Sequence, residues 1–356
     1  MEKQELPFEL GYRMPAEWAE HECTWMAWPK DPSTFPPELL PGAEKAYIEI
    51  IRNLHSGERV NLLVDSDGYA ARITGLLQAD GIGMENVALH VIGTGDVWFR
   101  DYGPIFLTKE GGEVAYTHWR FNAWGNKYYE LLNDTHIPEK IPIGSMRGFD
   151  VPMVLEGGSI DTNGKGTFLT TEQCLLNRNR NPQMSREVIE KNLHDYLGAT
   201  NIIWLKGGIA GDDTDGHVDD IARFVNDDTV VCALEEDQED ENFAILRQNY
   251  ELLRMARDQD GNRLNVVPLP MPEAVAYNGQ RLPASYANFY IANRKVLVPT
   301  FGGSNDLRAL EILRELFPGR AVVGIGCREL VYGFGALHCI TQQQPAASNT
   351  SSNMPD

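Results

Sequence analysis

The residue types best suited to covalent chemistry occur near the end of the chain, where residues 332–345 read YGFGALHCITQQQP. Cys339 follows a glycine-rich run, and Gly333 and Gly335 would let a substrate approach the backbone closely. A thiolate in this setting is a candidate nucleophile, although a cysteine taken alone is more often a small buried apolar residue. The other reactive residues of the chain favour the interpretation of Cys339 as a nucleophile.

Three acidic segments supply the partners that a nucleophilic thiol requires. They read DVWFRD at 96–101, EGGSID at 156–161 and DDTDGHVDD at 212–220. Together with Cys339 they provide an imidazole base, a carboxylate to orient that base and further carboxylates that could hold a cation. This set indicates covalent chemistry on a positively charged substrate.

The spacing of these residues predicts which of them act together. In an extended strand, residues two apart share a face, so His217 and Asp219 are expected to converge on one substrate. The same alternation puts His338 and Cys339 on opposite faces. We therefore expect His338 to be a packed or hydrogen-bonded histidine and not the base for this thiol.

Two further carboxylates have both a functional and a structural interpretation. Extended geometry would place Asp96, Trp98 and Arg100 on one face, where a carboxylate and an indole ring suit a cation. The alternative is a surface ion pair of Asp96 with a nearby arginine beside a core Trp98. Glu156 follows the apolar run PMVL and precedes two glycines, so it either orients His217 through a hydrogen bond or caps a turn.

The elements that must position these residues alternate between strand and helix. Strand-like composition is found at 59–65, 87–93, 166–171, 201–205, 229–234, 288–293, 295–300 and 321–326, and helical patterns are found at 41–54, 69–78, 185–197, 240–257 and 305–316. This alternation predicts an α/β protein. The short connections at 109–114 and 291–296 predict hairpins, which argue against a purely parallel sheet. We find no linker, and we expect one domain over 1–345 followed by a polar tail at 346–356.

Bulk composition excludes several classes of protein. The 356 residues are 42% hydrophobic and 23% charged, an ordinary globular balance, and the net charge of −20 argues against a nucleic-acid partner. Without a leader sequence or an apolar run of about 18 residues, we expect a soluble cytoplasmic protein and no membrane partner. The five cysteines lack a CxxC pair, so neither a disulfide framework nor a zinc ribbon is indicated.

Known cofactor motifs also fail. The GxG pairs lack the third glycine of the dinucleotide fingerprint, and GGSIDTNGKG lacks the spacing of a phosphate-binding loop. A calcium loop starting at Gly211 has glycine and alanine at its first and twelfth ligand positions. There is no HExxH motif, so a metal site would have to be assembled from distant histidines.

Taken together, these segments resemble the agmatine deiminase and bacterial-type peptidylarginine deiminase family of the guanidine-modifying, or pentein, superfamily. The matching runs follow the expected order along nearly the whole chain, at 14–29, 96–106, 155–182, 211–224, 285–293, 299–306 and 338–345. One departure is the GFGA sequence at 333–336, where the family often has three consecutive glycines. Another is VDDIARF after His217, which lacks a cysteine found in well-characterised agmatine deiminases.

This resemblance implies a pentein fold, a five-bladed pseudo-fivefold α/β propeller with the active site at its centre. It also implies roles for five residues: nucleophile Cys339, general acid/base His217, histidine partner Glu156, and guanidinium-binding carboxylates Asp96 and Asp219. Trp98 would lie beside the substrate. Neither a metal nor an organic cofactor is expected, the partner is a small cationic guanidine, and a homo-oligomer is compatible with this reading.

The reaction implied is hydrolysis of agmatine to N-carbamoylputrescine and ammonia, a step toward putrescine, through a covalent thiouronium on Cys339. The alternative substrates are peptidyl-arginine and free arginine, whose carboxylate would want a cationic clamp such as Arg178 or Arg180. A cysteine amidase or protease built on Cys339 would leave the aspartates at 96 and 219 without a role. A non-catalytic guanidinium-binding protein would leave a complete nucleophile and base set idle.

Overall fold

A computed structural model describes residues 5–347 of the chain. Within this range, five sheets share one local topology, in which an outer strand pairs antiparallel with a second strand and the second pairs parallel with a third. Four of these sheets are β4–β5–β6 (Ile105–Thr108, Val114–Arg120, Arg147–Val154), β7–β8–β9 (Asp161–Thr162, Thr167–Thr171, Asn201–Leu205), β10–β11–β12 (Ala222–Phe224, Thr229–Leu234, Asn265–Pro270) and β15–β16–β17 (Tyr290–Ile291, Lys295–Thr300, Ala321–Gly326). A separate hairpin joins β13 (Ala276–Tyr277) to β14 (Gln280–Arg281).

The fifth sheet joins the two ends of the described chain. β18 (Gln342–Pro345) pairs antiparallel with β1 (His21–Ala27), β1 pairs parallel with β2 (Arg59–Val64), and β3 (Val87–Val91) adds a fourth strand. Beyond β18, the Ala346 amide donates to the Glu20 carbonyl at 2.8 Å. The rest of the predicted tail, residues 348–356, lies outside the described residues.

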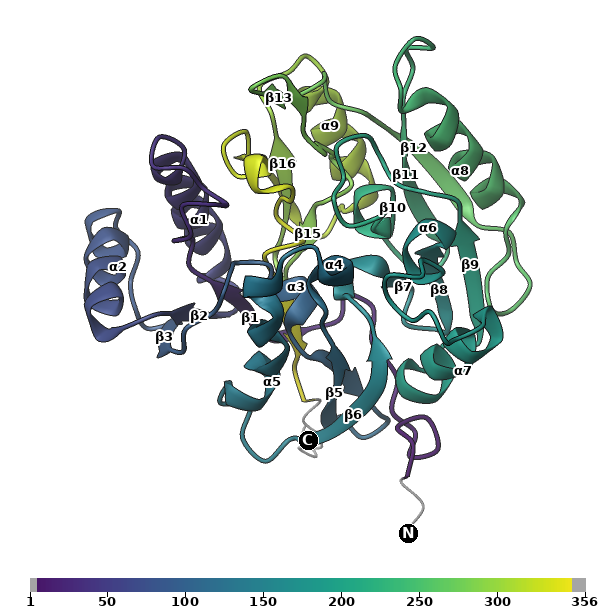
Figure 1. The fold of residues 1–356 in the computed structure, drawn as a ribbon, viewed down its shortest axis with the longest axis horizontal. Coiled ribbons are helices and arrows are strands. Elements are labelled where there is room, and N and C mark those ends of the chain that lie inside the picture. Colours follow the sequence, from purple (N-terminus) through teal and green to yellow (C-terminus); the bar gives the residue numbers. More distant parts are fainter. Residues whose placement is uncertain (1–4, 348–356) are drawn as a thin grey trace, which may run out of the picture.

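Helices connect the parallel strands of each sheet. The longer ones, α1 (Leu40–Leu54), α2 (Asp67–Ala79), α7 (Arg186–Leu197), α8 (Phe243–Met255) and α9 (Asp306–Leu316), lie toward the outside in Figure 1, whereas the short α3 (Phe99–Tyr102) and α4 (Ala123–Asn126) lie near the middle. The remaining short helices are α5 (Ile137–Lys140) and α6 (Glu172–Leu175). Apolar residues three or four apart explain the placement of α1, which buries Tyr47, Ile50 and Leu54 on one face.

The sequence prediction of the larger elements is confirmed. The five predicted helices correspond to α1, α2, α7, α8 and α9, and both predicted hairpins are antiparallel pairs, β4 with β5 and β15 with β16. Each predicted strand is present, although 288–293 contributes only the two residues of β15. Each of the five sheets mixes parallel and antiparallel pairs, so the sheet is not purely parallel, as expected.

The extended geometry expected for the reactive segments is wrong. Residues 96–101 fold into a turn that leads into α3, because the Asp96 side chain accepts from the Val97 amide at 2.8 Å and the Asp101 amide donates to the Trp98 carbonyl at 3.0 Å. Residues 212–220 form a loop in which Asp212 accepts from the Gly216 amide at 2.6 Å, followed by a 3-10 turn at Val218–Asp220. Aspartate side chains that bond to nearby amides favour such turns over strands.

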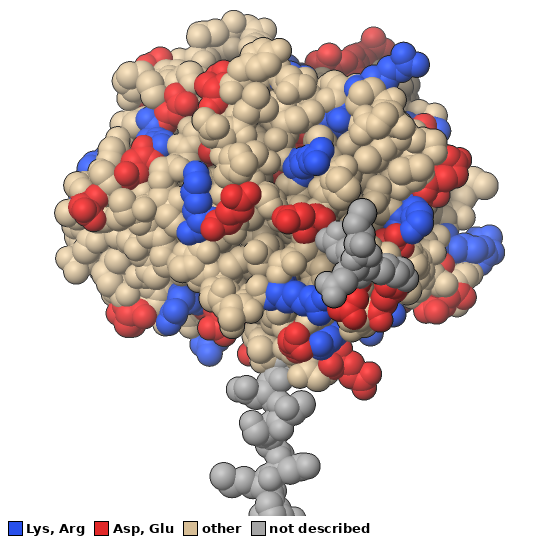
Figure 2. All heavy atoms as spheres, turned by 60° about the horizontal axis from the view of Figure 1, so that its bottom comes forward, with Lys and Arg blue, Asp and Glu red and all other residues tan. Residues whose placement is uncertain are grey.

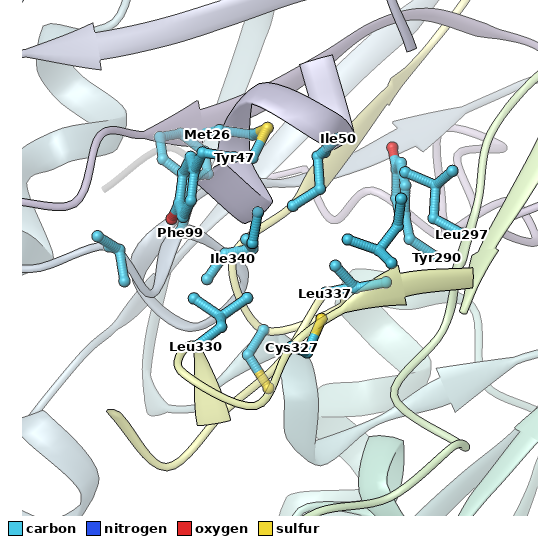
Figure 3. Packing of buried hydrophobic residues seen from close by; sticks show 14 of the residues in the cluster. Met26, Tyr47, Ile50, Phe99, Tyr290, Leu297, Cys327, Leu330, Leu337 and Ile340 are labelled. Carbon is cyan, nitrogen blue, oxygen red and sulfur yellow. The ribbon is translucent and has the colours of Figure 1, made fainter. Parts of the chain in front are cut away.

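The segment that carries Cys339 is anchored in the largest core cluster. Figure 3 shows Leu337 and Ile340, on either side of the Cys339 position, packed among buried side chains that include Ile50 of α1. Both leucine and isoleucine are fully buried. Core packing on two sides therefore fixes the position of the thiol. No helix in the described part of the chain combines the length and the apolar character that a membrane crossing requires.

Candidate active site

A pocket of about 340 Å³ reaches Cys339. It is lined by carboxylates (Asp31, Asp96, Asp101, Glu130 and Asp213), by aromatic rings (Trp98, Trp124, Tyr128, Tyr277, Tyr332 and Phe334) and by smaller residues, but by no lysine or arginine of the described chain. The lining residues come from six segments of the chain, at 31–34, 96–101, 124–131, 213–214, 277–282 and 332–339. A small cavity with acidic and aromatic walls suits an elongated organic cation.

Cys339 sits between one hydrogen-bond donor and several carboxylates. It is 6% exposed, and its sulfur accepts from Asn288 Nδ2 at 3.1 Å and lies 3.7 Å from Asp219 Oδ2. Burial raises the pKa of the Cys339 thiol well above its ordinary value, and the carboxylates of Asp219, Asp220 and Asp101 raise it further. The thiol is therefore protonated until a positive charge enters the pocket.

His217 is a buried imidazole beside Asp101, one of the carboxylates that raise the pKa of this thiol. Its Nδ1 lies 3.8 Å from Asp101 Oδ1, and neither ring nitrogen has a hydrogen-bond partner among the described residues. Burial alone would lower the pKa of His217, but Asp101, Cys174 and Glu156 raise it by more. The pKa of His217 therefore lies well above its ordinary value. The ring is therefore an imidazolium that can give up a proton at the site.

Gly158 is the point around which three of the functional groups gather. A Cβ atom at this position would lie 2.6 Å from His217 Nδ1 and 3.0 Å from a carboxylate oxygen of both Asp101 and Asp219. Glycine is required there because any side chain would collide with all three groups. The imidazole and two carboxylates thus surround one small volume beside Cys339.

Asp101 belongs to this group, and sequence reasoning did not select it. Its carboxylate accepts from the Gly158 amide at 3.0 Å and from Trp124 Nε1 at 2.9 Å, and it lines the pocket. Burial raises the pKa of Asp101 to about 6. The assumption of a strand had placed Asp101 on the face opposite Asp96, whereas the helical turn of α3 turns it toward His217. The sequence signal that could have identified Asp101 was its place at the end of the DVWFRD motif.

Asp96 also lines the pocket, but its oxygens are already engaged. It accepts from the Val97 amide at 2.8 Å, from Thr34 Oγ1 at 2.6 Å and from Trp98 Nε1 at 2.9 Å, and burial raises its pKa to about 7. These bonds hold the indole of Trp98 as a wall of the pocket. Arg100, expected on the same face, instead points away and lies 3.5 Å from Glu17.

Gly333 and Gly335 make room for this indole, and Gly333 also lines the pocket, where the sequence had suggested a close approach of substrate to the backbone. A Cβ atom at Gly333 would lie 2.8 Å from the Trp98 ring, and one at Gly335 would also collide with it. The glycines of the GFGA segment therefore allow two parts of the chain to pack closely.

Asp219 is held as a carboxylate by a buried relay. His338 Nδ1 lies 2.7 Å from Asp219 Oδ2, and His338 Nε2 lies 2.8 Å from Glu17 Oε2. Each ring nitrogen of His338 thus faces a carboxylate oxygen, to which it can donate a hydrogen bond when it carries hydrogen. Burial alone would raise the pKa of Asp219, but His338 lowers it below its usual range, and Asp219 Oδ1 remains without a partner among the described residues. The expectation that His338 is a hydrogen-bonded histidine is confirmed.

Glu156 lies near His217 but bonds to another residue. Its Oε1 accepts from Arg180 Nε at 2.6 Å, and its Oε2 has no partner in the described chain. Arg180 also pairs with Asp215 at 2.5 Å, so it is neither a surface charge nor free to clamp a substrate carboxylate. Ligand atoms of Glu156, Cys174 and His217 lie within 4.8 Å of one another, a spacing compatible with a metal ion, but Arg180 already compensates the glutamate.

Most of the residues selected from the sequence lie close together in the structure. Cys339, His217, Asp219 and Glu156 come together from distant parts of the chain, and Asp96 with Trp98 forms one wall of the same pocket. Asp101 and Asn288 were missed. The available signal for Asn288 was its place in the run 285–293, one of those that carry the family resemblance.

Known proteins resemble this chain along nearly its whole length. Residues 13–345 match the family model described as Porphyromonas-type peptidyl-arginine deiminase. The agmatine deiminase of Stutzerimonas stutzeri (strain A1501) is 38% identical over an alignment of 370 positions, which covers 96% of this chain and 97% of that protein. The structure of Enterococcus faecalis agmatine deiminase superposes with a TM-score of 0.90 at 33% identity, covering 97% of this chain and 98% of that one. An agmatine deiminase of C. jejuni with substrate bound gives a TM-score of 0.85 at 30% identity, covering 94% of this chain and 97% of that one.

Proposed function

The chain belongs to the Porphyromonas-type peptidyl-arginine deiminase family, and we propose that it hydrolyses agmatine to N-carbamoylputrescine and ammonia. The observation that carries this proposal is the pocket above Cys339, which has five carboxylates and no cationic residue in its described lining. The thiol, the imidazolium and the paired carboxylates at its end suit attack on a guanidinium carbon.

Binding of the guanidinium is assigned to Asp101 and Asp219. A guanidinium carbon is a weak electrophile, so its plane must be fixed while sulfur attacks, and two carboxylates provide this through charge-assisted hydrogen bonds. Both carboxylates face the volume beside Gly158, and Asp219 Oδ1 is unpartnered in the described chain. Asp96 then holds Trp98 against the substrate. This division differs from the expectation that Asp96 itself binds the guanidinium.

The arriving cation also activates the nucleophile. Its positive charge offsets the carboxylates that keep the Cys339 thiol protonated, so the thiol loses its proton to solvent as substrate binds. The thiolate then forms a bond to the guanidinium carbon. The carbon–nitrogen bond breaks as His217 protonates the departing ammonia, which leaves a thiouronium on sulfur.

Hydrolysis of the thiouronium uses the same residues, with His217 acting as a base and Cys339 as the leaving group. His217, now neutral, takes a proton from a water molecule that attacks the thiouronium carbon, and the carbon–sulfur bond breaks with its electron pair returning to Cys339. The product is a ureido compound. In this mechanism Glu156 is a positioning residue for His217, since its free oxygen faces the imidazole region while Arg180 fixes the other oxygen.

The outer part of the pocket favours agmatine over arginine. Agmatine and free arginine both have an ammonium at the far end, but arginine also has a carboxylate there, which Glu130 and Asp213 would repel. Lys127 lies 3.4 Å from Asp213 Oδ1 and compensates part of that one charge, but it does not line the pocket. Acidic and basic side chains are interspersed on the face drawn in Figure 2, so the net charge of −20 does not by itself form an acidic surface there. The preference for agmatine is therefore argued from the carboxylates that line the pocket.

The proposal extends to the organisation of the protein. We propose that the five sheets of common topology are the blades of a pentein propeller and that residues 1–345 act as a single catalytic domain. A cytoplasmic location is part of the proposal, because all five cysteines are free, as suits a reducing compartment.

The test is release of ammonia from purified protein with agmatine, free arginine and a blocked arginine peptide in parallel, with Cys339→Ala as the control. We expect turnover of agmatine, formation of N-carbamoylputrescine by mass spectrometry, and no release by the variant. Preference for the peptide would establish the alternative protein-modifying activity. Turnover that survives in Cys339→Ala would refute the thiol mechanism.

A further inference from the structure

Asn288 is a fully buried side chain in direct contact with the sulfur of Cys339. Its Nδ2 lies 3.1 Å from Sγ, and the residue immediately precedes the strands of the sheet β15–β16–β17, on a segment distant in sequence from every residue placed in the mechanism so far. A buried amide needs partners for both its donor and its acceptor. The partners of this one determine which way it points.

The orientation of the amide is fixed by the backbone of the nucleophile's own segment. Asn288 Oδ1 accepts from the His338 amide at 3.0 Å, and a backbone N–H can only donate. The oxygen must therefore face His338, which leaves the NH₂ group facing Cys339. Its second hydrogen bonds to the carboxylate of Asp220. The amide thus has one available role toward sulfur, that of a donor.

The sulfur has a marked need for such a donor. The carboxylates of Asp219, Asp220 and Asp101 all disfavour a negative charge on Cys339, and the backbone amide of Ala336 provides a second donor that acts against them. His217 and His338 are the other titratable groups at this end of the pocket, and both are bonded to or directed toward carboxylates and not toward the sulfur. A donor aimed at the sulfur stabilises its anion more than its neutral or alkylated form.

We propose that Asn288 is a catalytic residue that stabilises the Cys339 thiolate by donating a hydrogen bond to its sulfur. This inference rests on the proposed function of the same site. The hydrogen bond acts twice in the cycle: before attack, when the thiol has lost its proton, and in hydrolysis, when the carbon–sulfur bond breaks and sulfur leaves with the electron pair. In the thiouronium between these steps the sulfur is a weak acceptor, so the bond contributes little there.

Two variants separate this role from a purely structural one. Asn288→Asp keeps the oxygen that accepts from the His338 amide but presents an oxygen to sulfur in place of the NH₂ group. Asn288→Ala removes both bonds. If Asn288 only anchored the backbone of His338, the aspartate variant would be the milder change. If it donates to sulfur, the aspartate variant is the more severe one, because it adds a charge that disfavours the thiolate.

The readout is the rate of alkylation of Cys339 by iodoacetamide as a function of pH, followed by peptide mass spectrometry. We expect a rate about 10- to 100-fold below wild type at pH 7 for Asn288→Ala, as for loss of one hydrogen bond to a charged group, with the midpoint of the pH profile moved to higher pH. Asn288→Asp should be slower still. Urea unfolding of each variant reports stability separately.

Asn249 provides a matched control. It is also fully buried, its Oδ1 accepts from the Lys206 amide at 2.8 Å, and its Nδ2 donates to the Gly207 carbonyl at 2.9 Å, with no contact to Cys339. Asn249→Asp should alter stability but leave the pH profile of alkylation unchanged. An Asn288→Asp rate equal to that of wild type, or higher than that of Asn288→Ala, would overturn the proposal.

Alkylation does not depend on which guanidine is the substrate. If no guanidine is turned over but the variants alkylate in the expected order, the proposed function fails and the role of Asn288 stands. If agmatine is turned over and the order is reversed, the function stands and Asn288 is structural. If Asn288→Ala does not fold, the aspartate variant compared with wild type decides.

Discussion

Replacing Asp101 by asparagine tests the division of labour between the two aspartates of the DVWFRD segment. Asp101 Oδ1 lies 3.8 Å from His217 Nδ1, and it faces the volume beside Gly158 that is proposed for the guanidinium. At this distance and an effective dielectric constant of about 20, a pair of unit charges interacts with about 4 kcal/mol, which corresponds to a factor of about 1,000. Loss of one charge-assisted hydrogen bond alone would give about 1.5 to 3 kcal/mol. We therefore expect kcat/KM to fall about 100- to 1,000-fold.

The matched change is Asp96→Asn. Asp96 has a pKa of about 7 and accepts from three donors of the protein. The main effect of the variant is therefore to weaken the hydrogen bonds that hold Trp98. A neutral hydrogen bond contributes about 0.5 to 1.5 kcal/mol, so we expect a loss of about tenfold or less. Ammonia release under pseudo-first-order conditions gives both values, and thermal unfolding shows whether either variant is unfolded. A larger loss for Asp96→Asn than for Asp101→Asn would refute the assignment drawn from the geometry.

Three other predictions follow from contacts of the same site. Because the active form of Asp101 is the carboxylate and its pKa is raised to about 6, kcat/KM should decline as pH falls through about 6, and a pH profile that stays flat down to pH 5 would contradict this. His338→Gln removes the ring that bridges Glu17 and Asp219 and leaves a buried carboxylate without its partner, so urea unfolding should show a loss of about 1 to 3 kcal/mol, whereas an unchanged free energy of unfolding would show that the bridge is not needed. Cys339 should be the first cysteine to react with iodoacetamide, because it alone among the five lines the pocket; mass-spectrometric mapping that finds another cysteine labelled first would argue against its role.

Sequence patterns predicted the large elements of this fold well. Helices such as α1 and α9 carry apolar residues at the helical spacing over many residues, so their position follows from composition. Strands of two or three residues, such as β7 and β10, are too short to show an alternation, and their pairing depends on contacts with residues far along the chain. The repeated sheet topology was expected only from the family resemblance.

The candidate site was predicted less evenly. Cys339 and His217 were identified because few residue types can perform their chemistry, whereas the choice between Asp96 and Asp101 required the backbone conformation. The sequence analysis assumed an extended strand for the segment around them, but hydrogen bonds from side chains to nearby amides turn it into the start of α3. Asn288 shows the limit of sequence reasoning, since its contact with sulfur is made across 51 residues of chain.

The pairing of β18 with β1 determines when this protein can become active. Cys339 lies three residues before β18, and the partner strand is made from residues near the start of the chain. During synthesis, the edge of β1 therefore stays uncovered until β18 has left the ribosome, and Cys339 can take its place only then. A chain that stops before Cys339 carries His217, Glu156 and Asp101 but lacks the thiol that we propose as the nucleophile, so we expect it not to hydrolyse guanidines.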